Sequence, residues 1–166
     1  MCWRLLFLLA RLIRRLIELS GLQSVAGVVF VHRLDSSQVG PVELVSPAQP
    51  WALEYIRHTL RRWLSGVGAS PRVVDDVLIA VGDACTNVVD HAYGTEGGTV
   101  NVHLGLEGPD LVATIADTGQ WGPPSVGNRG RGTLLMRHCS DDLRIDHGPR
   151  GTTVVICRHL IEEETP

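Results

Sequence analysis

Asp83 and Asn87 are the two residues of this chain whose types and spacing most directly indicate chemistry. They stand four apart in the segment GDACTNVVDHAY, residues 82–93, and residues four apart share one face of an α-helix. An acidic residue one helical turn before an Asn, followed later by glycine-containing loops, suggests a nucleotide and metal site. The pair alone is a weak signal, because such residues usually form the solvated face of an amphipathic helix.

A second candidate is Asp117, which comes at the end of the apolar segment DLVATIAD and is followed by Thr118 and Gly119. A glycine permits close approach of the backbone to a ligand, and such a carboxylate can accept a hydrogen bond from an adenine amino group. Asp-x-Gly is also ordinary turn chemistry. The Asp-x-Gly motif therefore indicates a nucleotide site only in combination with the other motifs of the chain.

Two glycine-containing segments follow. Residues 127–132, GNRGRG, lead directly into TLLMRHC, whose helix we expect to begin at Thr133. Glycine-rich backbone that enters a helix N-terminus offers free N–H groups and a favourable dipole to a phosphate. Gly151-Thr152-Thr153 precedes an apolar strand, where a hydroxyl can complete a polar pocket floor, although Thr at a strand start also reflects β-propensity.

A central helix must carry Asp83 and Asn87. Ser70 and Pro71 form its start signal, because Ser caps free backbone N–H groups and Pro suits the first helical position. Gly94 is its expected end. Apolar residues recur between these points at three- and four-residue spacing and form the buried stripe of the helix: Val74, Val77, Val81, Ala84, Cys85 and Val88.

The other elements follow from periodicity and turn residues. We expect a strand at 42–46, a helix from Pro50 to Gly66, a hairpin of strands 99–106 and 110–117, a helix at 133–139, and strands at 143–146 and 152–158. This order of elements favours an α+β two-layer sandwich, because helices and strands come in separate groups: two helices, a hairpin, a third helix and two last strands.

Composition sets the remaining bounds. The 166 residues allow one domain with an extension. The net charge of −3, in a chain whose fifteen basic residues are all Arg, gives no support to nucleic-acid binding. The 4 cysteines form no CxxC pair and the 7 histidines are dispersed, so buried thiols in a reducing cytoplasm fit better than disulfides, and a protein-ligated transition metal is not expected.

Residues 1–20 form a basic amphipathic segment, with Arg4, Arg11, Arg15 and Glu18 on one helical face. Its apolar runs are too short for a membrane span, so weak contact with a membrane surface and docking on its own domain or on a second copy are both open. A third alternative is that translation starts further downstream. We expect residues 1–41 to be this helix plus a linker, 42–160 to be the compact domain, and 161–166 to be an acidic tail.

The ordered blocks AVGDACTNVVDHAY, IADTGQWGPP, RGRGTLLMRHCSDDLRI and GTTVVI resemble the GHKL (histidine-kinase-like) ATPase superfamily, and within it the small anti-sigma-factor serine/threonine kinases. The resemblance covers about residues 42–160. It implies a Bergerat-type fold, which is a two-layer α/β sandwich with a mixed sheet and helices on one face.

The resemblance also implies roles for individual residues. Asn87 would ligate Mg²⁺ beside the ATP phosphates, Asp117 and Gly119 would bind the adenine, and Thr153 would support the adenine end. The family usually has Glu, acting as general base, where this chain has Asp83, which is shorter by one methylene. The phosphate-binding residues would be Arg129, Gly130, Arg131, Gly132 and Thr133, although solvated loop arginines remain an alternative for Arg129 and Arg131.

The resemblance implies that the chain would be a cytoplasmic ATP-binding anti-sigma factor that phosphorylates a Ser or Thr of an anti-anti-sigma-factor partner. It would otherwise hold a sigma factor, with no direct nucleic-acid contact. Members of the family often form homodimers. The alternative is a non-catalytic nucleotide-binding module that sequesters its partner. A two-component histidine kinase is disfavoured, because no pair of dimerisation helices with a phosphoacceptor His precedes the domain.

Overall fold

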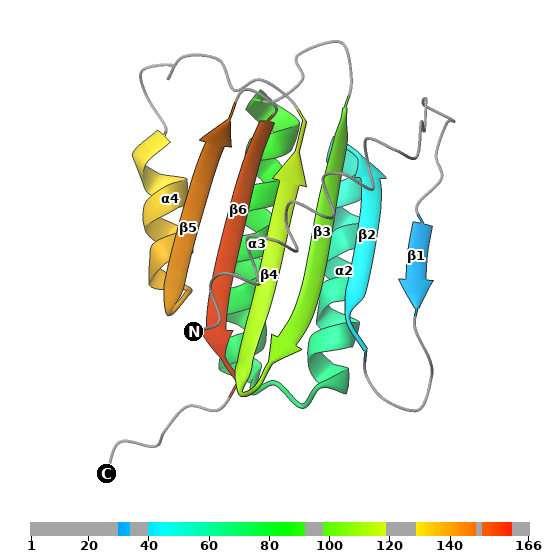
Figure 1. Cartoon of the computed structure of the whole chain (residues 1–166), viewed down its shortest axis with the longest axis vertical. Helices are drawn as coiled ribbons and strands as arrows, with labels where there is room; N and C mark the ends of the chain where they lie inside the picture. The colour runs from blue at the N-terminus through cyan, green and yellow to red at the C-terminus, as the bar shows by residue number, and fades with distance from the viewer. Residues whose placement is uncertain (1–29, 34–39, 92–97, 119–128, 149–150, 161–166) are drawn as a thin grey trace.

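The computed structural model describes residues 30–33, 40–91, 98–118, 129–148 and 151–160. These residues form two layers, a sheet and a row of helices that covers one of its faces (Figure 1). Within them the sheet has 6 strands in the order β1-β2-β3-β4-β6-β5. The elements in chain order are β1 (Phe30–Arg33), β2 (Val42–Pro47), α2 (Pro50–Gly66), α3 (Pro71–His91), β3 (Thr99–Glu107), β4 (Asp110–Asp117), α4 (Arg129–His138), β5 (Asp142–Gly148) and β6 (Gly151–His159).

The two-layer α+β sandwich with helices on one face is confirmed, but the expected mixed sheet is wrong. Among the residues that the structure describes, every pair of neighbouring strands is antiparallel. Two helices separate β2 from β3, so the chain re-enters the sheet in the opposite direction. The strands β4 and β5, which are joined through α4, run the same way, but β6 lies between them (Figure 1).

The strand β1 lies in the segment for which we expected a linker. It pairs with β2 in a register that sets Phe30 opposite Val45 and Arg33 opposite Val42. The sheet therefore extends beyond the expected domain start at Val42. The expectations for residues 1–29 and 161–166, and for the end of the central helix at Gly94, fall outside the described residues.

The helix α2 begins with Pro50 in its first turn and buries one apolar face, as its periodicity predicted. The buried residues are Ala52, Ile56, Leu60, Trp63 and Leu64. The indole Nε1 of Trp63 donates a hydrogen bond of 2.7 Å to the carbonyl oxygen of Gly40. This contact ties the chain just before β2 to the helix layer.

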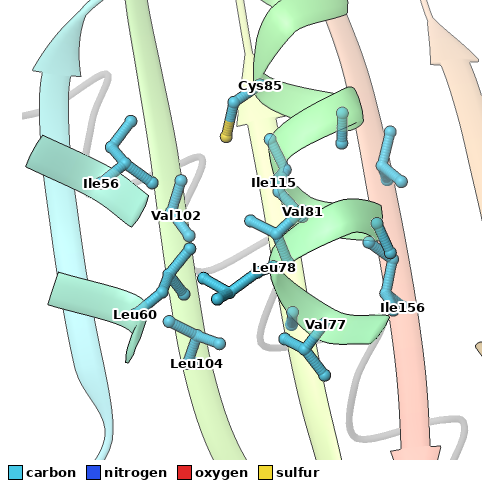
Figure 2. Close-up of a cluster of buried hydrophobic side chains, with 14 of the residues drawn as sticks. Ile56, Leu60, Val77, Leu78, Val81, Cys85, Val102, Leu104, Ile115 and Ile156 are labelled. Carbon is cyan, nitrogen blue, oxygen red and sulfur yellow. The ribbon is translucent and has the colours of Figure 1, made fainter. Parts of the chain in front are cut away.

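The helix α3 lies across the middle of the sheet and carries the central part of the core (Figures 1 and 2). Its predicted cap is present, since Oγ of Ser70 accepts a hydrogen bond of 3.3 Å from the backbone N–H of Val73. Val77, Val81 and Cys85 point from it toward Val102, Ile115 and Ile156 of the sheet (Figure 2). Complete burial raises the pKa of the Cys85 thiol to about 12.

An ion-pair network fixes the N-terminal half of α3. The Arg158 guanidinium on β6 contacts Asp76 of α3 at 3.0 Å and Asp141, between α4 and β5, at 2.7 Å. Asp141 also accepts a hydrogen bond of 2.6 Å from the backbone N–H of His159. The network joins α3, β6 and the entrance to β5, and so holds the helices in place on the sheet.

Candidate functional site

The first wall of the candidate site is the end of β4. Asp117 is only 2% exposed. Side chains alternate between the faces of a strand, and Asp117 is in phase with Ala113 and Ile115, which belong to the core under the helices. A buried carboxylate is thus directed to the helix-covered face at the end of the strand.

Gly151 packs directly against the backbone of Asp117. Its φ is +118°, a conformation that L-residues with a side chain rarely adopt. A Cβ built on Gly151 would overlap the carbonyl oxygen of Asp117 and would lie 2.8 Å from the Cα of Thr118. The glycine therefore permits the close approach of β6 to the residues that follow β4.

The strand register separates the two threonines after Gly151. Thr153 pairs with Ala116, and both alternate with core residues, so Thr153 faces away from the helices. Thr152 is in phase with the core residues Val154 and Ile156 and is 2% exposed. The expectation that Thr153 supports the adenine end is therefore corrected, because Thr152 is the threonine on the same face as Asp117.

The second wall is formed where α3 meets α4. Asp83 and Asn87 are half-buried on α3, and Gly132 of α4 lies against them. A Cβ added to Gly132 would be 3.4 Å from Oδ2 of Asp83 and 3.9 Å from Nδ2 of Asn87. The absence of a side chain at Gly132 leaves the polar atoms of both residues open on this side.

Burial sets the electrostatics of Asp83. Removal from solvent raises the pKa of its carboxyl group above the ordinary value, since desolvation disfavours the charged form. A carboxylate with a raised pKa is a stronger base, which suits it to accept a proton from a hydroxyl group. The neighbouring acidic residues have other roles: Asp76 pairs with Arg158 and Asp90 is exposed.

The glycine-rich segment differs from its prediction at one boundary. The helix α4 begins at Arg129 and not at Thr133, so Gly130 and Gly132 belong to its first turn. The first four N–H groups of a helix have no partner within it, so the predicted phosphate contacts at Arg129, Gly130, Arg131 and Gly132 coincide with a helix N-terminus. Thr133 is half-buried on the same helix, whereas Gly119 lies outside the described residues.

These donors and acceptors fit a magnesium nucleotide. A buried carboxylate at the end of β4 suits an amino group of a base, and backbone N–H groups at a helix start suit phosphate oxygens. The amide oxygen of Asn87 is a ligand that Mg²⁺ accepts beside phosphate. The space that a Cβ of Gly132 would fill gives room for such a group next to Asp83 and Asn87.

No role was predicted for His147 from the sequence, and Gly151 and Thr152 were singled out only as parts of the Gly151-Thr152-Thr153 motif. Strand alternation counted from Val154 and Ile156 could have identified Thr152. His147 could not have been found in this way, because its position beside Thr152 depends on the pairing of β5 with β6. The steric need for glycine at 151 likewise appears only once β4 and β6 are neighbours.

The fold and the site together define the class of a nucleotide-binding domain in which helices cover one face of an antiparallel sheet. The family model for the histidine kinase-like ATPase domain matches residues 46–158. The chain belongs to this family.

Its curated relatives include bacterial protein kinases. It is 32% identical to the serine-protein kinase RsbW of Bacillus subtilis over 72% of this chain and 85% of that protein. It is 36% identical to the protein of the same name from Bacillus licheniformis over 74% of this chain and 87% of that protein. The predicted resemblance to the anti-sigma-factor kinase subfamily of the GHKL superfamily is thereby confirmed.

A solved structure gives the same result. The crystal structure of the RsbU and RsbW domains of Rv1364c from Mycobacterium tuberculosis matches with a TM-score of 0.62 and 28% sequence identity. The match covers 72% of this chain and 32% of that chain, so the present chain spans about a third of that larger protein. None of the helices among the described residues has both the length and the apolar composition needed to cross a bilayer.

Proposed function

We propose that this chain binds magnesium ATP between α3 and the end of β4 and phosphorylates a Ser or Thr of a partner protein. The observation that carries the proposal is the approach of Gly132 to Asp83 and Asn87, in a chain whose relatives are named serine-protein kinases. An open polar corner beside a helix N-terminus suits phosphate groups.

The site residues divide by function. Asp117 accepts a hydrogen bond from the adenine amino group, with Thr152 beside it. The N–H groups at the start of α4 and the side chains of Arg129 and Arg131 bind phosphate oxygens. Asn87 ligates the metal. Bound ATP and Mg²⁺ supply the transferable phosphoryl group and neutralise its negative charge.

Asp83 is the proposed general base. Its carboxylate accepts the proton from the hydroxyl of the partner's Ser or Thr, and burial has raised its pKa toward the range in which a base is effective. Asp is shorter than Glu, so the hydroxyl must come closer to α3 than a glutamate would require.

The partners follow from the subfamily. The chain would hold a sigma factor, and an unphosphorylated anti-anti-sigma factor would displace that sigma factor. The proposed location is the cytoplasm, and the proposed assembly is a homodimer. Liposome co-sedimentation of the full chain and of a variant that starts at Gly21, and so keeps β1, tests the proposed membrane contact of residues 1–20. Equal sedimentation of the two would exclude that contact.

Phosphoryl transfer provides the direct test. Purified candidate anti-anti-sigma factors are incubated with γ-labelled ATP and the wild-type chain, with Asp83→Asn as the active-site variant. Asp90→Asn is the matched control, because Asp90 is an exposed Asp on the same helix. We expect label on a Ser or Thr with the wild type and with Asp90→Asn, and a loss of at least about 100-fold with Asp83→Asn.

The second candidate, a non-catalytic module that sequesters its partner, is favoured by the short side chain at Asp83. It predicts ATP binding without label transfer to any candidate. Asp83→Glu separates the two proposals further, since an increase in a slow transfer rate supports the kinase. Equal transfer by wild type and Asp83→Asn would rule out Asp83 as the base.

A further inference from the structure

His147 lies beside the adenine end of the proposed site. It is opposite Thr152 in the pairing of β5 with β6, and its Nδ1 is 3.3 Å from Oγ1 of Thr152. His147 is in phase with Leu143 and Ile145 of β5, which pack against the core. The His147 side chain is therefore on the same face of the sheet as the helices, at the same end as Asp117, and it is exposed at this edge.

The three strands set these side chains in one row. The pairing of β4 with β6 runs to Ala116 opposite Thr153; Asp117 and Thr152 are the next residues of the two strands, and Gly151 lies against the backbone of Asp117. The row across β5, β6 and β4 is thus His147, Thr152, Asp117.

The hydrogen-bonding capacity of these groups determines which of them donates and which accepts. A threonine hydroxyl has one hydrogen to donate and can accept from another group, whereas a carboxylate only accepts. When Nδ1 of His147 carries the ring proton, it donates to Oγ1 of Thr152. The hydroxyl hydrogen of Thr152 is then available to another acceptor, and Asp117, on the same face of the neighbouring strand β4, is a carboxylate that can accept it.

We propose that His147 is a positioning residue for base recognition: it orients the Thr152 hydroxyl, which in turn orients the Asp117 carboxylate toward the 6-amino group of adenine. The inference rests on the proposed function, because it concerns the base of the same nucleotide. Its consequence is selectivity. An oriented carboxylate accepts from a 6-amino group and repels the 6-oxo oxygen of hypoxanthine.

The test compares ADP with inosine diphosphate, which differs from ADP at position 6 of the base. Calorimetry gives the dissociation constant of each for the wild type and for His147→Phe, which keeps a ring of similar size without its nitrogen atoms. His147→Asn restores a donor near the position of Nδ1. Asp146→Asn is the matched control, because Asp146 is exposed and in the opposite phase of β5.

We expect His147→Phe to lower the preference for ADP over inosine diphosphate by about 3- to 10-fold, the range for one hydrogen bond. His147→Asn should restore most of the preference, and Asp146→Asn should leave it unchanged. In a Thr152→Val background the His147→Phe change should have no further effect on the preference, since the hydroxyl through which it acts is gone.

A merely structural role gives a different result. If His147 only stabilises the pairing of β5 with β6, then His147→Phe lowers the melting temperature and weakens the binding of ADP and of inosine diphosphate equally. An unchanged preference for ADP over inosine diphosphate would then overturn the inference. The inference is also overturned if His147→Phe lowers the preference for ADP as much in the Thr152→Val background as in the wild type. A wild type that binds neither nucleotide refutes the proposed function itself.

Discussion

Replacement of Gly132 by Ala should improve the stability of this protein and impair its site. Gly132 is in the first turns of α4, where a glycine costs about 0.5–1 kcal/mol relative to alanine. A Cβ at this position meets Oδ2 of Asp83 at 3.4 Å and Nδ2 of Asn87 at 3.9 Å. These are ordinary contacts, so the helix can accept the methyl group without moving.

The same methyl group occupies the space proposed for a phosphate oxygen. Loss of one charge-assisted hydrogen bond costs about 1.5–3 kcal/mol, which corresponds to a 10- to 100-fold weaker binding of magnesium ATP. The gain in helix propensity corresponds to a rise of about 2–4 °C in melting temperature per kcal/mol for a chain of this size. Affinity and stability should therefore change in opposite directions.

The assay pairs calorimetric titration with thermal unfolding. Gly82→Ala is the matched control, because Gly82 is also helical but its Cβ would meet Nη2 of Arg57 at 3.6 Å and not the site. Both variants should keep or raise the melting temperature, and only Gly132→Ala should lose affinity. Unchanged affinity in Gly132→Ala would refute the role of this glycine in the nucleotide site.

Three further predictions concern the rest of the molecule. Gly151→Ala should lower the free energy of unfolding, measured by chemical unfolding, by more than about 3 kcal/mol, because the cost of its positive φ and the cost of overlap with Asp117 add together. Gly108→Ala is the control, since Gly108 has a φ of +64° and open space around it, and it should lower the free energy of unfolding by about 1–2 kcal/mol. Equal losses of stability in the two variants would contradict the overlap at Gly151. Burial lowers the pKa of His103, although the negative charges of Glu43 and Glu107 act to raise it. The stability that neutral His103 contributes is therefore complete above about pH 6.5 and is lost as pH falls through the lowered pKa. His103→Gln should flatten this decline in stability, and a pH profile identical to that of the wild type would contradict the prediction. Cys85 is buried and has a pKa of about 12, so it should react with iodoacetamide only when the protein unfolds. Cys157 is half-exposed and has a pKa of about 11, so it should react slowly in the native protein. Equal rates of modification of the two cysteines in the native protein, measured by peptide mass spectrometry, would contradict this prediction.

The sequence predicted most of the helices and strands, but it did not predict β1 or which strands lie next to one another in the sheet. The stripe of Val77, Val81 and Cys85 predicted α3 because helix periodicity is local. The strands of the hairpin around Gly108 were also predicted, because a turn residue and two alternating segments mark it. Strand order depends on contacts between distant segments, so the antiparallel pairing of β4 with β6 was missed.

The site shows the same division. Asp83 and Asn87 were identifiable by their spacing on one helix. The choice between Thr152 and Thr153 depended on which face of β6 meets the helices, and the β-propensity of Thr is the same at both positions. The start of α4 at Arg129 was also missed, because glycines in the segment favoured a loop.

The binding of ATP with and without Mg²⁺ to the wild type and to Asn87→Ala tests the central claim most directly. Alanine favours a helix at this half-buried position of α3, so the variant should fold, and thermal unfolding confirms this in the same samples. We predict that the wild type binds ATP more tightly when Mg²⁺ is present and that Asn87→Ala loses this enhancement. An affinity for magnesium ATP that is the same in both proteins would contradict the assignment of Asn87 and of the site built around it.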